Sequence, residues 1–151
     1  MTDHRAKIRA TLNPLFLNGY DALCNLLGKE WQPYFGYRSI EEQDKLYAQG
    51  RTAPGEIVTK AEGASSAHCY GCAVDFTMID DKGNFIWLKD EDPRIAEFTT
   101  AVWRAGLRSG ELYHDPLHAE LKISCTFHDV AAIFKANGLD AAMAYIKTKM
   151  I

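Results

Sequence analysis

Two segments in the second half of the chain alternate apolar and polar side chains, and this period of two most constrains the fold. Residues 72–77 place Cys, Val and Phe on one face and Ala, Asp and Thr on the other, while residues 117–121 alternate leucine and alanine with His118 and Glu120. A period of two is typical of β-strands, whose successive side chains point to opposite faces. The pattern therefore predicts two strands, one presenting Asp75 and the other His118.

Helical spacing and helix-end signals mark the segments around these strands. A capping residue followed by proline starts two helices, at Asn13 and at Asp92. Ser39 and Glu42 form a capping box, in which each side chain satisfies an amide of the other residue. Together with the apolar stripes near the C-terminus, these signals predict helices over residues 14–27, 39–49, 93–107, 130–134 and 139–146.

The remaining segments predict strands and one long loop. Residues 31–38 are rich in aromatics and too short for a helix, so we expect a strand whose end delivers Arg38 to a loop. Residues 81–87 are expected to form a hairpin. Residues 51–67 are expected to form a long irregular loop, and loops of this length in compact domains usually have a function. Without an internal repeat or a linker, residues 1–151 are expected to form a single α+β domain.

Composition excludes several classes of protein. The chain has 151 residues, 47% hydrophobic and 25% charged, which is ordinary for one globular domain. A fold of this size needs no structural metal, so any metal should take part in chemistry. The net charge of −3 argues against nucleic-acid binding. No run approaches the ~20 apolar residues of a membrane span, and the N-terminus lacks a signal-peptide pattern, so we expect a protein made in the cytoplasm and not inserted in a membrane.

The four cysteines fit reduced thiols better than a secreted disulfide framework. Cys69 and Cys72 form a CxxC motif, which suits a redox pair or half of a zinc knuckle. No second CxxC accompanies it, and packing thiols are therefore favoured.

Two histidines and a carboxylate predict a catalytic zinc site. His68 precedes one predicted strand, Asp75 lies on that strand and His118 lies on the other. A two-histidine, one-carboxylate set leaves the fourth tetrahedral position to water, as catalytic zinc sites do. The alternative is three separate polar residues, which is the commoner situation for any single histidine.

A second metal motif is weaker. The segment from His114 to His118 superficially mimics the helical HExxH signature of zinc peptidases. Pro116 argues against it, because proline inside a helix costs about 3 kcal/mol.

Three motifs stand in order along about residues 30–122. The early one is G-x-R-S with a downstream glutamine, the central one is SxHxxGxAxD and the late one is DxxHxE. The residues that carry them are Gly36, Arg38, Ser39 and Gln43, then Ser66, His68, Gly71, Ala73 and Asp75, and finally Asp115, His118 and Glu120. In these motifs the chain resembles the zinc metallopeptidase family of D-alanyl-D-alanine carboxypeptidases and phage L-alanyl-D-glutamate endopeptidases, VanY-like and LAS-type, which is grouped with the lysostaphin and hedgehog folds.

This resemblance implies a small antiparallel sheet that carries the zinc site and is flanked by helices, with a C-terminal helical extension over about residues 127–149. It implies one Zn²⁺ per chain, held by His68, Asp75 and His118. Asp115 would be the general base, and Arg38 would hold a substrate carboxylate or stabilise the oxyanion. The alternatives are a turn-forming Asp115 before proline and an Arg38 in a surface ion pair.

The resemblance also implies roles for the other residues of the motifs. Gly71 is expected to meet a backbone demand that only glycine satisfies cheaply. Ser66 either hydrogen bonds substrate or shapes its loop, and Gln43 is expected to bind substrate or support a residue that does. Glu120 shares a face with His118 and either fixes the tautomer of that imidazole or is solvated. His114 either assists near the oxyanion or lies on the surface.

The resemblance implies a monomeric zinc peptidase that cuts the stem peptide of bacterial peptidoglycan, foremost an antimicrobial phage endolysin with L-alanyl-D-glutamate endopeptidase activity. By the same analogy it would be made in the cytoplasm of a host bacterium and would act on the cell wall in the periplasm. Two alternatives stay open: a D-alanyl-D-alanine carboxypeptidase or dipeptidase, and a non-catalytic, zinc-stabilised module that binds the cell wall.

Overall fold

The computed structural model describes residues 3–151, which form two compact units. The first unit comprises the chain up to Tyr37 and residues 71–122, and the second comprises residues 38–70 and 123–151. The first contains the sheet and the second is helical. The expected single-domain organisation stays a prediction.

The first unit is built on a five-stranded sheet in the order β1-β2-β5-β4, with β3 paired to β2. All of these pairings are antiparallel. The expectation of an α+β fold with a small antiparallel sheet is thereby confirmed. The strands are β1 (Trp31–Phe35), β2 (Ala73–Ile79), β3 (Phe85–Ile86), β4 (Arg108–Ser109) and β5 (His118–Glu120).

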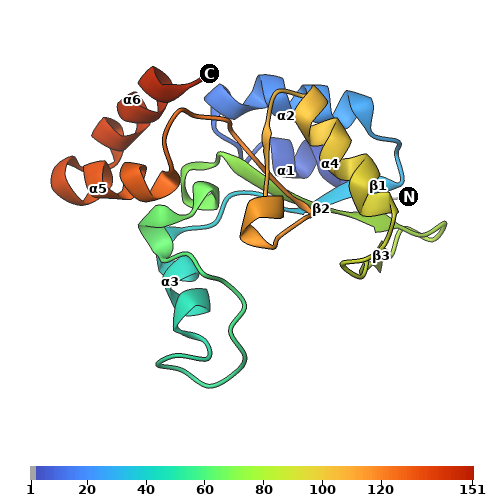
Figure 1. Ribbon diagram of the computed structural model, residues 1–151, viewed down its shortest axis with the longest axis horizontal. Helices are drawn as coiled ribbons and strands as arrows, with labels where there is room; N and C mark the ends of the chain where they lie inside the picture. The colour runs from blue at the N-terminus through green and yellow to red at the C-terminus, as the bar shows by residue number, and fades with distance from the viewer. Residues whose placement is uncertain (1–2) are drawn as a thin grey trace. The chain divides into compact units, whose positions relative to one another are not determined.

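Helices cover this sheet, and their ends show why they form where they do (Figure 1). The side chain of Asn13 accepts a hydrogen bond from the amide of Leu15, so the predicted capping residue is confirmed. A short N-terminal helix precedes it and was not expected from the sequence. The helical elements of the first unit are α1 (His4–Arg9), α2 (Pro14–Leu26), α4 (Arg94–Arg104) and the 3₁₀ turn η3 (Glu111–Tyr113).

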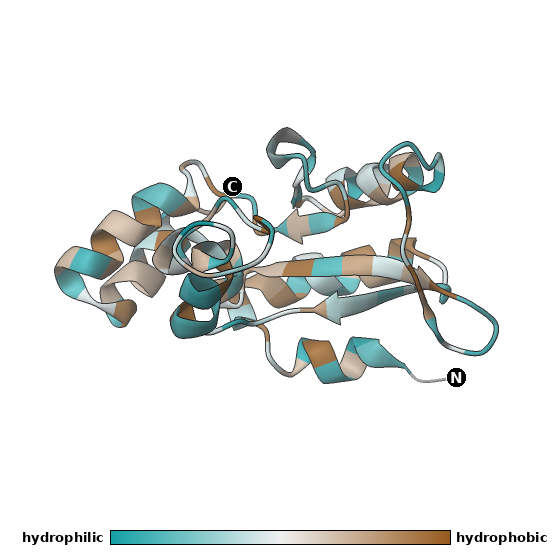
Figure 2. Cartoon of the chain, turned by 90° about the horizontal axis from the view of Figure 1, so that it is seen from below, coloured by the Kyte–Doolittle hydropathy of each residue, from teal (hydrophilic) through white to brown (hydrophobic). Residues whose placement is uncertain are grey.

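Aromatic side chains join α2 and α4 to the sheet. Trp31 of β1 stacks on Phe98 of α4 with ring centroids 5.4 Å apart, and Phe98 also lies 5.6 Å from Phe76 of β2. Tyr20 of α2 lies 6.3 Å from Phe76. All four rings are buried, and such rings contribute the largest apolar areas of a core. Hydrophobic and hydrophilic residues alternate along the central strand in Figure 2, as the sequence pattern predicts.

The second unit consists of α3 (Ile40–Ala48), the 3₁₀ turns η1 (Gly63–Ser65) and η2 (Ala67–Tyr70), α5 (Phe127–Asn137) and α6 (Leu139–Lys149). Ser39 caps α3 by accepting from the amide of Glu42, as expected. Tyr70 of η2 stacks on Phe127 at the start of α5, with ring centroids 5.9 Å apart. This contact holds the turn that carries His68 against α5.

The structure differs from the sequence predictions at several places. The strand expected over residues 31–38 ends at Phe35, where the β1–β2 register shifts. The helix expected to be capped by Asp92 has Pro93 at its N-cap, although the Asp92 side chain still accepts from the amide of Arg94. The loop expected over residues 51–67 contains a 3₁₀ turn.

Gly71 and the CxxC thiols behave as packing elements. Gly71 has a φ of +66°, and a Cβ there would lie 2.7 Å from the amide nitrogen of Asn13, so the expected demand for glycine is confirmed. Cys69 and Cys72 are buried free thiols. Burial raises the pKa of Cys69 to about 11 and that of Cys72 to about 12, so both thiols are protonated near neutral pH.

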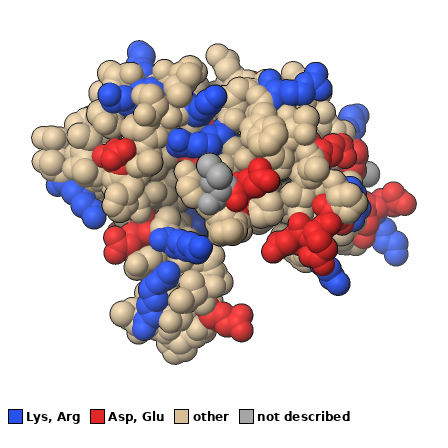
Figure 3. All heavy atoms as spheres, in the orientation of Figure 1, with Lys and Arg blue, Asp and Glu red and all other residues tan. Residues whose placement is uncertain are grey.

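The described surface carries charges of both signs. Basic and acidic side chains are interspersed on the face drawn in Figure 3, and acidic ones gather near β3. Within residues 3–151, no helix has the length and apolar character needed to cross a membrane.

Arg5 ties three elements of the first unit together. Its Nη1 donates to the carbonyl of Cys24 at 2.9 Å, and its Nη2 donates to Gly28 at 2.8 Å and to Trp31 at 3.0 Å. The guanidinium of α1 thus binds carbonyls at the C-terminal end of α2 and at the start of β1. A cation at a helix C-terminus also opposes the negative end of the helix dipole.

Replacing Arg5 with methionine should therefore destabilise the first unit. Hydrogen bonds to charged groups contribute about 1.5–3 kcal/mol each, so we expect the free energy of unfolding to fall by at least that much in urea denaturation. Arg9→Met is the matched control, because Arg9 pairs with Asp21 on the exposed surface. Equal losses in both variants would contradict this role for Arg5.

Candidate metal centre

Strand pairing places Asp75 opposite His118. The two residues are direct partners in the antiparallel β2–β5 ladder, so their side chains lie on the same face of the sheet. Each residue is 9% exposed. A hydrogen bond of 3.0 Å joins His118 Nδ1 to Asp75 Oδ1. The first unit therefore brings one nitrogen and one oxygen ligand together by its backbone register alone.

His68 belongs to η2 of the second unit and is 5% exposed. Its carbonyl accepts a hydrogen bond of 3.2 Å from the amide of Arg38. The early motif that contains Arg38 and the central motif that contains His68 are thus joined directly through the backbone.

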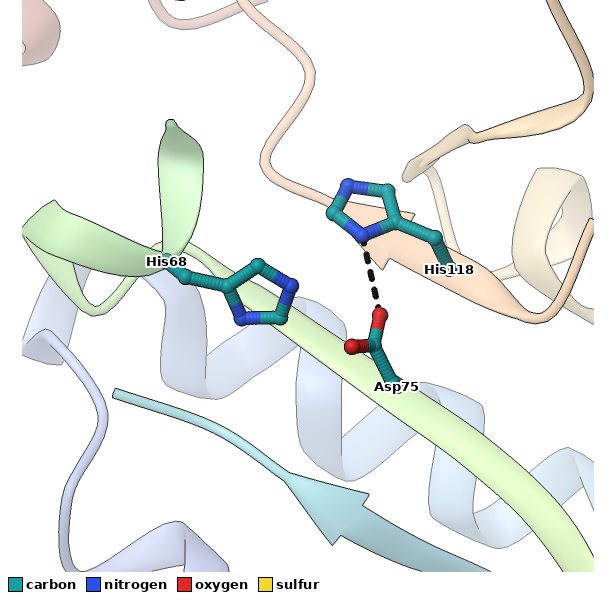
Figure 4. Close-up of side chains that lie close together, drawn as sticks. All are labelled: His68, Asp75 and His118. Carbon is teal, nitrogen blue, oxygen red and sulfur yellow. Dashed lines mark hydrogen bonds and ion pairs between the residues drawn. The ribbon is translucent and has the colours of Figure 1, made fainter. Parts of the chain in front are cut away.

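His68, Asp75 and His118 have the donor set and the spacing of a metal site. One ligand atom from each lies within 4.8 Å of the others, and the three side chains point toward one another in Figure 4. Zinc binds nitrogen and oxygen at about 2.0–2.2 Å, so two atoms on one ion stand about 3–4 Å apart. The predicted ligands are therefore brought together, and their role as ligands stays a prediction.

The protonation of His118 fits the same conclusion. Burial alone lowers the pKa of this imidazole, but hydrogen bonding and electrostatic attraction to Asp75 and Glu120 outweigh burial and raise it. Two carboxylates thus stabilise a positive charge at this buried ring. A metal cation held by His118 and Asp75 would supply that charge in place of the proton.

Asp115 lies beside the same nitrogen. Its Oδ2 is 3.9 Å from His118 Nδ1, and its side chain is 57% exposed. The carboxylate therefore faces solvent while remaining next to the ligand pair, which is the position that a general base requires.

A tight turn at Gly110 sets this position. The amide of Gly110 donates to the carbonyl of His118, and the carbonyl of Gly110 accepts from the amide of Asp115, both at 3.0 Å. A Cβ on Gly110 would lie 2.8 Å from the Cβ of His118 and would also collide with the carbonyl of Asp115. The sequence analysis did not single out Gly110, because the need for glycine there arises from a backbone approach across the turn.

Glu120 lies on the other side of the His118 ring. Its Oε1 is 3.7 Å from His118 Nε2, and the residue is 4% exposed. The solvated alternative for Glu120 is therefore wrong. Arg108, which was not expected to contribute, places its Nε 3.7 Å from the same carboxylate oxygen.

Gln43 supports Arg38 within the second unit. Arg38 Nη1 donates to Gln43 Oε1 at 2.7 Å, and Gln43 Nε2 donates to the carbonyl of Ala61 at 2.8 Å and to Thr59 Oγ1 at 3.2 Å. Gln43 is buried and uses both ends of its amide. Of the two roles expected for Gln43, the geometry favours supporting another residue.

The remaining motif residues lie as follows. Ser66 is buried, and its carbonyl accepts from the amide of Cys69, so it shapes the turn before His68. His114 is exposed and has a left-handed backbone with a φ of 57°. It lines an open cleft of about 540 Å³ with Trp103 and Pro116. His118 lies on a strand, so the helical HExxH alternative is wrong.

Comparisons with known proteins agree with this geometry. The family model for VanY, D-alanyl-D-alanine carboxypeptidase, matches residues 16–104. The peptidoglycan L-alanyl-D-glutamate endopeptidase CwlK of Bacillus subtilis (strain 168) is 51% identical over 57 residues, which are 38% of this chain and 34% of CwlK. The match thus spans about a third of that relative.

A solved structure shows the same fold. The L-Ala D-Glu endopeptidase ChiX of Serratia marcescens superposes with a TM-score of 0.56 at 18% sequence identity, covering 92% of this chain and 93% of ChiX. The α+β arrangement is therefore shared over nearly the whole chain. The family match covers more than half of the sequence and includes His68 and Asp75. On this evidence the chain belongs to the VanY family of D-alanyl-D-alanine carboxypeptidases.

Proposed function

We propose that this protein is a zinc-dependent endopeptidase that cleaves the L-alanyl-D-glutamate bond of peptidoglycan stem peptides. The observation that carries the proposal is the meeting of two carboxylates at one nitrogen: Asp75 Oδ1 lies 3.0 Å and Asp115 Oδ2 lies 3.9 Å from His118 Nδ1. One carboxylate is buried as a ligand should be, and the other is exposed as a base should be. The bond specificity is that of the named relative CwlK.

His68, Asp75 and His118 would hold the ion. When bound there, zinc supplies a Lewis acid that lowers the pKa of water toward about 7 and polarises the scissile carbonyl. A single carboxylate among the three ligands leaves the site net positive, which favours both effects. The chemistry of the donor set suits zinc better than magnesium or calcium, which prefer oxygen ligands.

Asp115 would move the proton. Its carboxylate accepts a proton from the attacking water and then delivers it to the leaving amine, so that the D-glutamate product departs with a neutral amino group. The exposed position of Asp115 lets it reach both the water and the substrate nitrogen. His114 and Pro116, the chain neighbours of Asp115, line an open cleft, which is a candidate place for part of the stem peptide.

Arg38 would bind the negative charge of the substrate or of the oxyanion. Its backbone is bonded to His68, and its guanidinium is anchored on one side by Gln43. A planar, permanently charged group held in this way has a fixed orientation. The hydrogen bond to the buried amide of Gln43 supports a role of Arg38 in the site.

The experiment that tests the proposal is digestion of purified peptidoglycan with and without a chelator, followed by mass spectrometry of the fragments. Chelator-sensitive cleavage that leaves N-terminal D-glutamate is the expected result. Release of terminal D-alanine with the L-alanyl bond intact would assign the carboxypeptidase activity in the family name instead. The phage origin, the monomeric state and the periplasmic site of action stay predictions from the sequence.

Asp115→Asn should abolish turnover without releasing the metal. We expect kcat to fall by about 10²–10⁴, the usual contribution of a general base, while zinc content and the thermal unfolding midpoint hold. Muropeptide hydrolysis and metal analysis measure the two effects. His68→Ala is the contrasting variant, since it should lose zinc. If Asp115→Asn still cleaves at the wild-type rate, Asp115 is not the general base.

Zinc affinity should fall as the pH falls. The raised pKa of His118 means that this ring is protonated in the metal-free protein at neutral pH, so each ion bound must displace a proton. We expect the apparent Kd for zinc to rise about tenfold for each pH unit below 7. Titration against a competing chelator measures it, and proton release follows from calorimetry in two buffers. A Kd independent of pH would contradict this protonation.

Arg38→Lys should impair catalysis while leaving the metal in place. Removing one donor to a developing oxyanion costs about 10²–10³ in kcat, and lysine cannot reproduce the planar fork. Gln43→Leu should give a smaller loss, because Arg38 remains but loses its anchor. Arg51→Lys is the matched control, an exposed arginine of the same unit. Loss of zinc in Arg38→Lys would show instead that the residue is needed to build the metal centre.

A further inference from the structure

We infer that Arg108 and Glu120 are positioning residues that fix which nitrogen of His118 faces the metal. In this arrangement the Glu120 carboxylate faces Nε2 of His118 and favours a proton there, Arg108 holds Glu120 in place, and Nδ1 is left for the ion. The inference rests on the zinc site of the proposed function and adds to it a pair of residues that touch neither the ion nor the substrate.

Strand pairing brings Arg108 and Glu120 together. Arg108 of β4 is the direct partner of Glu120 of β5 in the antiparallel ladder. Their side chains therefore lie on one face of the sheet, and Arg108 Nε stands 3.7 Å from Glu120 Oε1. The Glu120 side chain is only 5% exposed and that of Arg108 is 21% exposed. Solvent screening of this ion pair is consequently weak.

The same register places Glu120 against His118. Residues two apart on a strand share a face, and Glu120 Oε1 lies 3.7 Å from His118 Nε2. Asp75 occupies the opposite edge of the ring, 3.0 Å from Nδ1. The imidazole is therefore held between two carboxylates, each facing one nitrogen.

Charge explains why Arg108 is needed. A buried carboxylate without a partner is strongly unfavourable, and two carboxylates beside one imidazole repel each other. Arg108 is a permanent cation, so it neutralises Glu120 at every working pH. It also holds the Glu120 carboxylate toward the β4 side, away from Asp75. Glu120 is thereby kept as a hydrogen-bond acceptor for His118 and does not compete as a fourth protein ligand.

Zinc titration of the variants tests this role. Partners that orient a ligand histidine typically contribute 10–100-fold to metal affinity. We expect Glu120→Gln to raise the zinc Kd by about that factor and Arg108→Gln to raise it about tenfold. Arg108→Lys keeps the positive charge, so its Kd should lie between those of Arg108→Gln and the wild type. Arg9→Met is the control, because it removes an arginine from an exposed pair in the same unit. The Kd of this control should equal that of the wild type.

Nitrogen NMR of the zinc-loaded wild type gives a readout that needs no variant. Long-range proton–nitrogen correlation should show His118 protonated at Nε2 and shifted at Nδ1 by the metal. Metal ligation through Nε2 would overturn the inference, and so would unchanged zinc affinity in folded Glu120→Gln and Arg108→Gln. Failure of the wild type to bind zinc would instead remove the proposed function itself.

Discussion

The antiparallel register of β2 and β5 is the constraint on which the rest of the site depends. It pairs Asp75 with His118 directly, and a slip of one residue in β5 would turn His118 to the face of the sheet opposite Asp75. The aromatic core prevents such a slip, because Phe76, next to Asp75, faces Phe98 of α4 on the other side of the sheet. Packing of the aromatic core therefore fixes the strand register, and the register sets the positions of Asp75 and His118.

Burial of this pair decides its electrostatics. Two carboxylates and one imidazole in a buried environment favour a positive charge on the ring, which is seen as the raised pKa of His118. A divalent ion would suit the same field, since it carries more charge than a proton and could bind the imidazole of His118 and the carboxylate of Asp75 at once. The arrangement is therefore a site built for a cation, and Arg108 balances the second carboxylate at its far side.

Local signals in the sequence predicted the local parts of the structure. The caps at Asn13 and Ser39 and the alternation around Asp75 and His118 depend on residues a few positions apart, and the structure confirms them. The motif order also led to the correct family. Arg108 and Gly110 were missed because their roles come from strand pairing and from a close backbone approach, neither of which leaves a periodic pattern.

The turn from Gly110 to His118 carries two side chains, Asp115 and His118, whose proposed roles need opposite environments. A metal ligand must be buried so that solvent does not compete for the ion, whereas a general base must reach water and substrate. Asp115 and His118 are only three residues apart, yet one side chain is 57% exposed and the other 11%. The amide and the carbonyl of Gly110 each form a backbone hydrogen bond in this turn, one with His118 and one with Asp115. These bonds hold the chain where it passes from the exposed Asp115 to the buried His118. A larger residue at position 110 would collide with His118 and with the carbonyl of Asp115, and the Asp115 carboxylate would lose its place beside His118 Nδ1.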